Sequence, residues 1–360
     1  MATETIGTLD YNEIVFPKLG IDLHVNSTAF SIGGLDIQWY GILITLGLVL
    51  AMIYAFTQVK KYGLNPDRVL DCIIGGIIGG VVGARAYYVL LNWSDYAGDW
   101  KSIFNIRGGG LAIYGGIIGS LLVGFLVAKI RKVKFLPLLD IVGIGFLLGQ
   151  GIGRWGNFFN QEAFGCNTTL PWGMFSETTR AYLMGSTVTA QSGVTIDPNL
   201  PVHPTFLYES IWCFVGFLLL FRYIKKRKFN GDIALRYMIW YGAGRFWIEA
   251  LRTDSLMLVP SIGLRASQLV AGIAVVVGVA AEIYFTHKFK DKPLMVKLAM
   301  TADNKAAVNK LSKEKTVIGL MTDTDTELLA SSPRKLFVER TEAYNAEVKR
   351  TIAESGKTEK

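Results

Sequence analysis

Charged side chains are scarce over most of this chain. Only 18% of its 360 residues are charged, whereas about 25% is usual for soluble domains. The last 74 residues contain 26 of the 66 charged side chains, so the first 286 residues contain only 40. This composition excludes a soluble Rossmann or barrel enzyme. The net charge of +8 divides equally between the two parts, which argues against a nucleic-acid-binding stripe, and no nucleic-acid partner is expected.

Cysteine is scarce, and metal-binding motifs and a basic N-terminal stretch are lacking. The chain has three cysteines (Cys72, Cys166 and Cys213) and three histidines, with no CxxC pair and no HExxH motif. We therefore expect no metal site. Residues 1–36 contain five acidic residues and one lysine, the reverse of the basic start of a cleavable signal peptide, so none is expected.

Long apolar runs are plentiful. A membrane-spanning helix needs about 20 mostly apolar residues, and seven runs qualify: 37–59, 69–91, 109–130, 135–153, 206–224, 233–251 and 264–286. The sequence thus predicts an all-α membrane protein with seven transmembrane helices. Its expected parts are an N-terminal segment (1–36), helices 1–4 (37–153), a small head domain (154–205), helices 5–7 (206–286) and a tail (287–360).

The basic residues between the runs predict an orientation. Loops on one side of the expected membrane carry 15 lysines and arginines and those on the other side carry seven. Cytoplasmic loops are the more basic ones, so we expect the N-terminus and residues 154–205 outside and the C-terminus in the cytoplasm. The run 69–91 also contains Gly75, Gly79 and Gly83, a spacing that favours close helix packing in lipid.

The densest group of polar residues lies at residues 151–165. Arg154, Asn157, Asn160 and Glu162 stand in a glycine-rich segment that ends at Gly165. An arginine can bind a phosphate through two parallel hydrogen bonds, and glycine lets the backbone approach a ligand. This segment is the first candidate for a binding site. A simple helix end with a snorkelling arginine is the structural alternative.

Two further groups lie in the second half of the chain. Tyr241, Arg245 and Glu249 are four residues apart and share one helix face, with Arg245 about midway along its apolar run, where a charge is costly and usually functional. A structural Arg–Glu pair is the alternative. His203, at the start of the run 206–224, is a candidate acid or base, and a helix cap or hydrogen-bond donor is the structural alternative.

These groups resemble the prolipoprotein diacylglyceryl transferase family over about residues 30–286. The family signature G-R-x-G-N-F-x-N-x-E-x-x-G matches Gly153 through Gly165 at every fixed position. Further family features match at Trp39-Tyr40-Gly41, Gly83-Ala84-Arg85, His203-Pro204 with Leu207-Tyr208-Glu209, and Tyr241-Gly242 with Arg245-Phe246 and Glu249.

The resemblance implies a reaction and its partners. The family transfers the diacylglyceryl group of phosphatidylglycerol to the lipobox cysteine thiol in the signal peptide of a preprolipoprotein, and releases glycerol 1-phosphate. It works in the bacterial plasma membrane, among membrane lipids, and without a metal or organic cofactor. A substrate thiol also explains why the chain needs no nucleophile of its own.

The resemblance also implies residue roles. Arg154 and Arg245 would hold the phosphoryl group, whose negative charge grows as the C–O bond breaks, with Asn157 at the headgroup. Glu162 and Glu249 would orient the arginines or line the cavity. The expected catalytic residues are Arg154, Arg245, Tyr114 and His203. The expected substrate-binding residues are Tyr40, Arg85, Gly115, Asn157, Asn160, Glu162, Gly165, Tyr241 and Glu249.

One position departs from the family pattern. Some relatives carry a histidine, proposed as catalytic, where this chain has Tyr114. Tyrosine has an unperturbed pKa of about 10, so Tyr114 is a poor base at neutral pH. We expect it to position the headgroup, while the field of two arginines favours the thiolate. A transporter of an anionic solute is the alternative function, but we find no internal repeats of the kind common in transporters.

Overall fold

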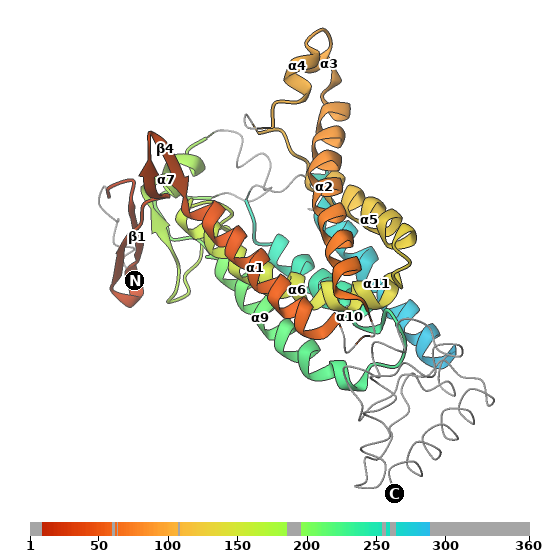
Figure 1. Cartoon of the computed structure of the whole chain (residues 1–360). Coiled ribbons are helices and arrows are strands. Elements are labelled where there is room, and N and C mark those ends of the chain that lie inside the picture. Colours follow the sequence, from red (N-terminus) through yellow and green to blue (C-terminus); the bar gives the residue numbers. More distant parts are fainter. Residues whose placement is uncertain are drawn as a thin grey trace, which may run out of the picture. The chain divides into compact units, whose positions relative to one another are not determined.

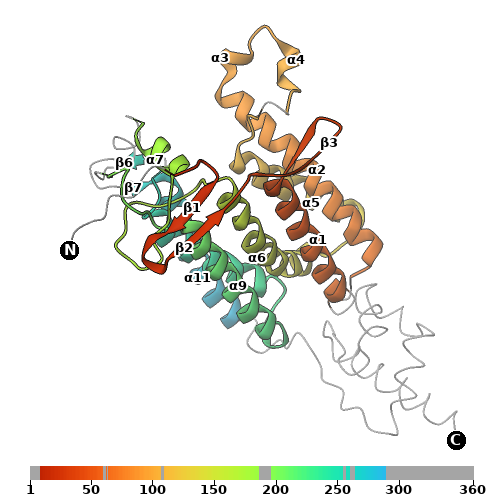
Figure 2. The ribbon, with the colours of Figure 1, turned by 90° about the vertical axis from the view of Figure 1, so that its left-hand side faces the viewer.

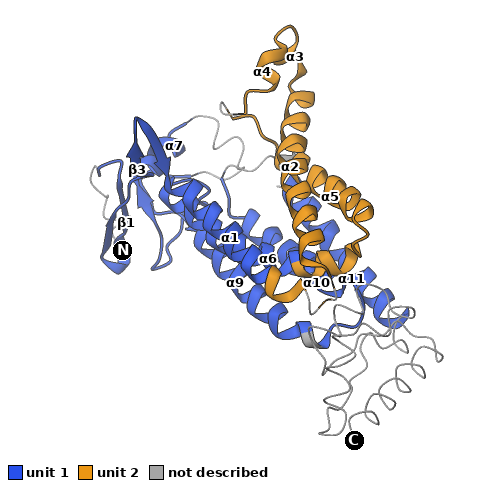
Figure 3. Cartoon of the chain, in the orientation of Figure 1, with its two compact units in different colours: residues 1–55, 142–290 blue, residues 56–141, 291–360 orange. Residues whose placement is uncertain are grey.

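The computed structural model describes residues 9–59, 62, 64–106, 109–185, 196–253, 257–259 and 264–288. The chain divides into two compact units (Figure 3), which are described separately. Unit 1 comprises residues 1–55 and 142–290, and unit 2 comprises residues 56–141 and 291–360. The expected tail, 287–360, lies outside the described residues from residue 289 onward.

The described residues are mainly helical (Figure 1). The long helices are α1 (Trp39–Val59), α2 (Pro66–Leu91), α5 (Ile113–Ile130), α6 (Phe135–Phe159), α9 (Thr205–Tyr223), α10 (Asp232–Glu249) and α11 (Ala266–Lys288). The short ones are α3 (Trp93–Tyr96), α4 (Trp100–Ile103), α7 (Glu177–Leu183) and the 3-10 turns η1 (Pro17–Leu19) and η3 (Ile224–Lys226).

Six of these helices are long and apolar enough to cross a membrane: α1, α2, α5, α6, α9 and α11. They correspond to six of the seven runs expected from the sequence. The seventh run, 233–251, does form a helix, α10, but its 18 residues include four charged side chains: Asp232, Arg236, Arg245 and Glu249. A seventh span therefore stays a prediction, whereas the helix itself is confirmed.

The carboxyl end of α6 differs from the expected one. The run 135–153 was expected to end before Arg154, but the helix continues to Phe159 and so carries Arg154 and Asn157 on its last turns. It ends where the backbone becomes left-handed at Gln161 (φ 52°) and Ala163 (φ 57°), a conformation that costs non-glycine residues energy unless the surroundings hold it. Hydrogen bonds hold this loop: Gln161 donates to the Tyr11 carbonyl (2.7 Å), and Thr205 donates to the Ala163 carbonyl.

Three small sheets accompany the helices of unit 1. The first has the strand order β2 (Ile21–His24), β1 (Glu13–Phe16), β5 (Phe175–Ser176), and all pairs are antiparallel. The second is the hairpin of β3 (Thr28–Ile32) and β4 (Leu35–Gln38), and the third pairs β6 (Met257–Val259) with β7 (Leu264–Arg265). Figure 2 shows the β3–β4 hairpin at the start of α1, apart from the β1–β2 pair.

A hydrophobic core joins the N-terminal strands to the segment after α6. Its buried members are Ile14, Phe16, Val25, Phe158, Phe164, Met174, Leu183, Ile196, Val202 and Phe206. The sequence treated residues 1–36 and 154–205 as separate parts. Because β1 of the first part pairs with β5 of the second, they share one sheet and one core.

Unit 2 is built on close packing between α2 and α5. A Cβ atom on Gly79 would lie 2.5 Å from the Gly119 carbonyl oxygen, and one on Gly83 would lie 2.4 Å from that of Gly115. The two backbones therefore touch along the glycine row of α2, which confirms the packing role expected for that row. Asn65 caps α2 by accepting from the Arg68 backbone N–H at 3.1 Å, and Pro66 follows at the first helical position.

Candidate active site

The centre of the candidate site is a buried carboxylate, Glu209, on the first turns of α9. Its side chain is 4% exposed and contacts arginines from two other segments. Arg154 Nη2 lies 2.6 Å from Oε2, and Arg245 Nη1 lies 2.9 Å from Oε1. Arg252, just after α10, approaches Oε1 at 3.6 Å. Glu209 thus gathers arginines from α6 and α10 at one point.

A second carboxylate orients Arg245 from the other side. Arg245 Nη2 lies 2.5 Å from Glu249 Oε2, one helical turn along α10. Ser267, at the start of α11, donates to the other Glu249 oxygen, and Arg265 donates to the Glu249 backbone carbonyl. Arg245 is therefore held between two fixed carboxylates, and its direction is set by contacts from α9, α10 and α11.

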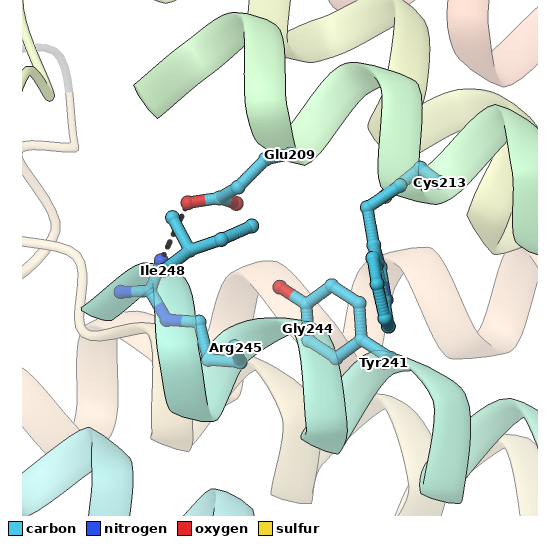
Figure 4. Close-up of a pocket in the computed structure, with 7 residues that line it drawn as sticks. Glu209, Cys213, Tyr241, Gly244, Arg245 and Ile248 are labelled. Atoms are coloured by element: carbon cyan, nitrogen blue, oxygen red, sulfur yellow. Dashed lines mark hydrogen bonds and ion pairs between the residues drawn. The ribbon is translucent and has the colours of Figure 1, made fainter. Parts of the chain in front are cut away.

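A hollow opens beside this centre. It is lined by Glu209, Trp212, Cys213, Tyr241, Gly244, Arg245 and Ile248. Figure 4 shows Arg245 joined to Glu209, with the Tyr241 hydroxyl turned toward that pair. Polar groups from α9 and α10 thus face one space between apolar helices.

The asparagines of the signature segment form a neighbouring network. Arg154 Nη1 contacts Asn157 Oδ1 at 3.4 Å, while Asn157 and Asn160 both donate to Glu162 Oε1, at 2.9 and 3.2 Å. Glu162 was expected to orient an arginine or line the cavity. It accepts instead from the two amides, one of which contacts Arg154, so its effect on the arginine passes through Asn157.

His203 belongs to a separate chain of hydrogen bonds. Trp172 Nε1 donates to the Tyr208 hydroxyl at 2.8 Å, and this hydroxyl lies 3.0 Å from His203 Nδ1. In this chain of hydrogen bonds, Tyr208 donates to Nδ1 when Nε2 carries the ring proton. Burial lowers the pKa of His203 below its ordinary value, which favours this neutral ring.

Gly165 has a packing reason for being a glycine. A Cβ atom there would lie 2.8 Å from His203 Cβ and 2.9 Å from the Leu251 carbonyl oxygen. The strand-like segment at 165–166 exchanges hydrogen bonds with His203 and donates from Cys166 to Leu251 (2.7 Å). It therefore ties the segment before α9 to the segment after α10. Tyr40 packs in the same way on Gly156, where a Cβ would lie 2.6 Å from its ring.

Three of the expected site residues belong to unit 2. Arg85 is buried, lies 5.0 Å from the Tyr96 ring centre, and donates to four backbone carbonyls, at Ser102, Ile103, Gly109 and Gly110 (2.6–2.9 Å). It thereby holds the loop that leads into α5. Tyr114 is the second residue of α5 and is 40% exposed. Gly115 lies against Gly83, and a Cβ atom added to Gly115 would lie 2.3 Å from the Gly83 carbonyl oxygen.

The structure thus brings together Arg154, Arg245, Tyr241 and Glu249, with Asn157, Asn160 and Glu162 beside them. Glu209 is the principal residue to which the sequence assigned no role. It could have been found by the argument that selected Arg245, because it too is a charge inside an apolar helical run. Ser267 and Trp172 carried no comparable signal, because single hydroxyl and indole groups at helix ends and in loops are ordinary.

Known proteins resemble this chain closely. Residues 27–284 match the model of a family described as prolipoprotein diacylglyceryl transferase. A phosphatidylglycerol–prolipoprotein diacylglyceryl transferase of Clostridioides difficile is 43% identical over 267 residues, which cover 74% of this chain and 98% of the relative. Proteins of the same name from Finegoldia magna (45% over 262 residues, 72% and 96% covered) and Lysinibacillus sphaericus (38% over 273 residues, 76% and 96% covered) also match.

Proposed function

The chain belongs to the prolipoprotein diacylglyceryl transferase family, and we propose that its arginine–glutamate centre carries out the transfer named for its relatives. It is a multi-pass membrane transferase. It moves the diacylglyceryl group of phosphatidylglycerol to the cysteine thiol of a prolipoprotein, the first step of lipoprotein maturation. The bond formed is S–C, and the bonds broken are the C–O bond to the phosphate and the S–H bond of the thiol. Glycerol 1-phosphate leaves, and the thiol proton passes to it or to water.

The pair of arginines at the centre is the observation that carries this proposal. Arg154 and Arg245 reach the two oxygens of Glu209 from α6 and α10, so two guanidinium groups lie together among apolar helices. Charges in such a place are costly and are usually functional. Guanidinium groups bind phosphate through paired, charge-assisted hydrogen bonds, and the phosphodiester of phosphatidylglycerol would be their partner.

The same charge favours the reaction over simple binding. As the C–O bond breaks, the phosphate oxygen gains negative charge, so Arg154 and Arg245 stabilise the transition state more than the bound lipid. Their field also lowers the pKa of a substrate thiol that enters the site, which increases the reactive thiolate. Glu209 and Glu249 contribute by fixing the arginines before substrate arrives, since prepositioned charges need no rearrangement during the reaction.

The remaining residues have supporting roles in this proposal. Asn157, Asn160 and Tyr241 would bind the glycerol headgroup, with Glu162 holding the two amides. By the family resemblance, Tyr40 and Gly115 would contact substrate and Tyr114 would position the headgroup, while Arg85 would act by fixing the loop before α5. His203, neutral and protonated at Nε2, would donate a hydrogen bond. The enzyme would work without a metal or organic cofactor.

We place the protein in the bacterial plasma membrane, with the N-terminus outside and the C-terminus in the cytoplasm, because the basic loops predict this orientation. Prolipoproteins that carry a lipobox cysteine in the signal peptide would then meet the site from within the same membrane. The alternative, a transporter of an anionic solute, is disfavoured because the relatives that cover the described helices are named as transferases.

The experiment is transfer by the purified enzyme. Vesicles containing phosphatidylglycerol are incubated with a lipobox peptide, and the thioether product is measured by mass spectrometry. We expect product with the natural chain and a loss of about 1,000-fold in kcat/KM for Arg245→Ala or Arg154→Ala, about 4 kcal/mol of transition-state stabilisation. In both variants, turnover should fall far more than the folded yield.

Arg180→Ala is the matched control. Arg180 also faces a glutamate, Glu177 at 3.5 Å, but on α7 and outside the centre. It should keep normal activity. Absence of product with the natural chain, or equal losses in all three arginine variants, would contradict the proposal. Solute flux in the same vesicles without peptide modification would instead support the transporter.

A further inference from the structure

The β3–β4 hairpin has two chemically different faces. Its strands are joined by Gly33 and Gly34, both with positive φ (58° and 82°), the two-residue turn that matches the twist of a hairpin. The paired residues alternate. Phe30 pairs with Ile37 and Ile32 pairs with Leu35, while Ser31 pairs with Asp36 between them. Since side chains alternate across a strand, one face is wholly apolar.

The apolar face is exposed. Phe30 is 50%, Ile32 67% and Leu35 66% exposed. An isolated two-stranded hairpin is marginal in water, and a gathered apolar surface usually marks a contact with another surface. The polar face, by contrast, pairs within itself. Ser31 donates to Asp36 at 2.5 Å, and the Gln38 side chain donates to Thr28 at 3.1 Å. The hairpin therefore has one face suited to water and one that needs a covering partner.

The hairpin is joined directly to a membrane helix. β4 ends at Gln38 and α1 begins at Trp39. The Trp39 backbone N–H donates to the Ser27 carbonyl at 2.9 Å, which closes the base of the hairpin on the first residue of α1. The first turns of α1 continue with the exposed side chains of Tyr40 and Ile44. The apolar face of the hairpin is thus continuous along the chain with exposed side chains of a candidate span.

We propose that the apolar face of the β3–β4 hairpin lies on the membrane, at the boundary between headgroups and acyl chains in the leaflet that holds the amino end of α1. Two facts set this depth. The outer edges of a two-stranded hairpin present unpaired backbone groups, which the hydrocarbon interior does not tolerate but hydrated headgroups satisfy. Trp39 at its base is also the residue type that anchors helices at that boundary.

The experiment measures the depth of each face in vesicles. Single cysteines are introduced as Ile32→Cys and Leu35→Cys on the apolar face, and as Ser31→Cys and Asp36→Cys on the polar face. The full-length enzyme is labelled with an environment-sensitive fluorophore and placed in vesicles of phosphatidylethanolamine and phosphatidylglycerol. Background from the native cysteines, of which Cys72 and Cys213 are buried, is taken from the natural chain. The quencher is a lipid spin-labelled near its headgroup.

We expect strong quenching and a blue-shifted emission for labels at residues 32 and 35, and neither for labels at residues 31 and 36. A water-soluble quencher should give the opposite order. Equal responses on the two faces would overturn the proposal. It would also be overturned if labels at residues 32 and 35 escaped the lipid quencher but became shielded on addition of a lipobox peptide, because the face would then bind the peptide. The quenching does not depend on the transfer reaction, so a failure of this proposal can be distinguished from a failure of the proposed function.

Discussion

Glu209 shows how a single residue gives the candidate centre its shape. An arginine side chain has many rotamers, and two long cations in an apolar setting would repel each other. A carboxylate that contacts Arg154, Arg245 and Arg252 reduces both problems, since it offsets charge and sets direction through hydrogen bonds. The free-energy cost of burying Glu209 is offset by its contacts with these arginines.

Replacing that residue should separate positioning from charge. Glu209→Gln keeps the size of the side chain but removes its charge, so the arginines lose part of their fixed geometry and the centre becomes more positive. We expect kcat to fall about 100-fold, or about 2.7 kcal/mol. KM for phosphatidylglycerol should not rise, because the anion still meets ample positive charge. Steady-state kinetics in vesicles measure both quantities.

Glu177→Gln is the matched control for Glu209→Gln, because Glu177 faces Arg180 outside the centre and its loss should leave kcat unchanged. An increase in KM with unchanged kcat for Glu209→Gln would mean that the carboxylate serves substrate binding alone.

His203 should make the stability of the folded protein depend on pH, with a sign that can be stated in advance. Burial lowers its pKa below the ordinary 6.5, so the unfolded state binds more protons between the two values. Stability should therefore be constant above pH 6.5 as far as His203 is concerned, and should decrease as pH falls through 6.5 toward the folded-state pKa. Thermal unfolding midpoints measured from pH 5 to 8, in the range where histidine titrates, would show this.

The His203→Gln variant should lack that component of the pH dependence. His24→Gln, at an exposed position on β2, should retain it. A natural protein that became more stable as pH fell below 6.5 would be inconsistent with a neutral, half-buried His203.

At the scale of elements, the site depends on where α6 ends and on the contacts made by the segment that follows it. The helix carries Arg154 and Asn157 to its last turns, and the loop beyond it uses left-handed residues at Gln161 and Ala163. The segment at Gly165 then passes between the residues before α9 and those after α10. Glycine is required there because neighbouring backbones leave no space for a side chain.

Two glycines of the same signature should therefore respond differently to alanine. Gly165→Ala would place a Cβ 2.8 Å from His203 Cβ, and overpacking of this kind costs about 1–3 kcal/mol. We expect its unfolding midpoint in detergent to fall by about 5 °C. Gly153→Ala meets only Ile44, at 3.9 Å, and should remain near the natural value. Equal midpoints for the two variants would show that the segment at Gly165 adjusts without cost.

At the scale of the whole molecule, the match to the family ends before the tail begins. The family match stops at residue 284, and the Clostridioides difficile relative is covered over 98% of its own length by 74% of this chain. We therefore expect a chain truncated after Lys288 to insert into membranes and to transfer diacylglyceryl groups at the natural rate. Product formation per inserted molecule is the measurement, and its loss in a normally inserted truncation would assign the tail a part in the reaction.

Much of the structure of this protein can be predicted from local sequence. Apolar runs predict helices wherever about 20 residues avoid charge, because an apolar environment requires every backbone group to pair within its own segment. The glycine row at Gly75, Gly79 and Gly83 predicts close packing for the same local reason. Arg154, Arg245 and Glu249 could be selected because charges in apolar runs are costly and need a purpose.

The tertiary structure alone decided which partners those charges have. Glu209 is 55 residues from Arg154 and 36 from Arg245, and no periodicity in the sequence relates such distant positions. The sharing of one sheet by the N-terminal strand β1 and β5 was equally hidden, because strand pairing depends on backbone hydrogen bonds rather than on side-chain identity. Local sequence patterns thus specify the helices and select the candidate site residues. Their assembly around one carboxylate was determined by long-range packing, which brings together groups that the chain keeps apart.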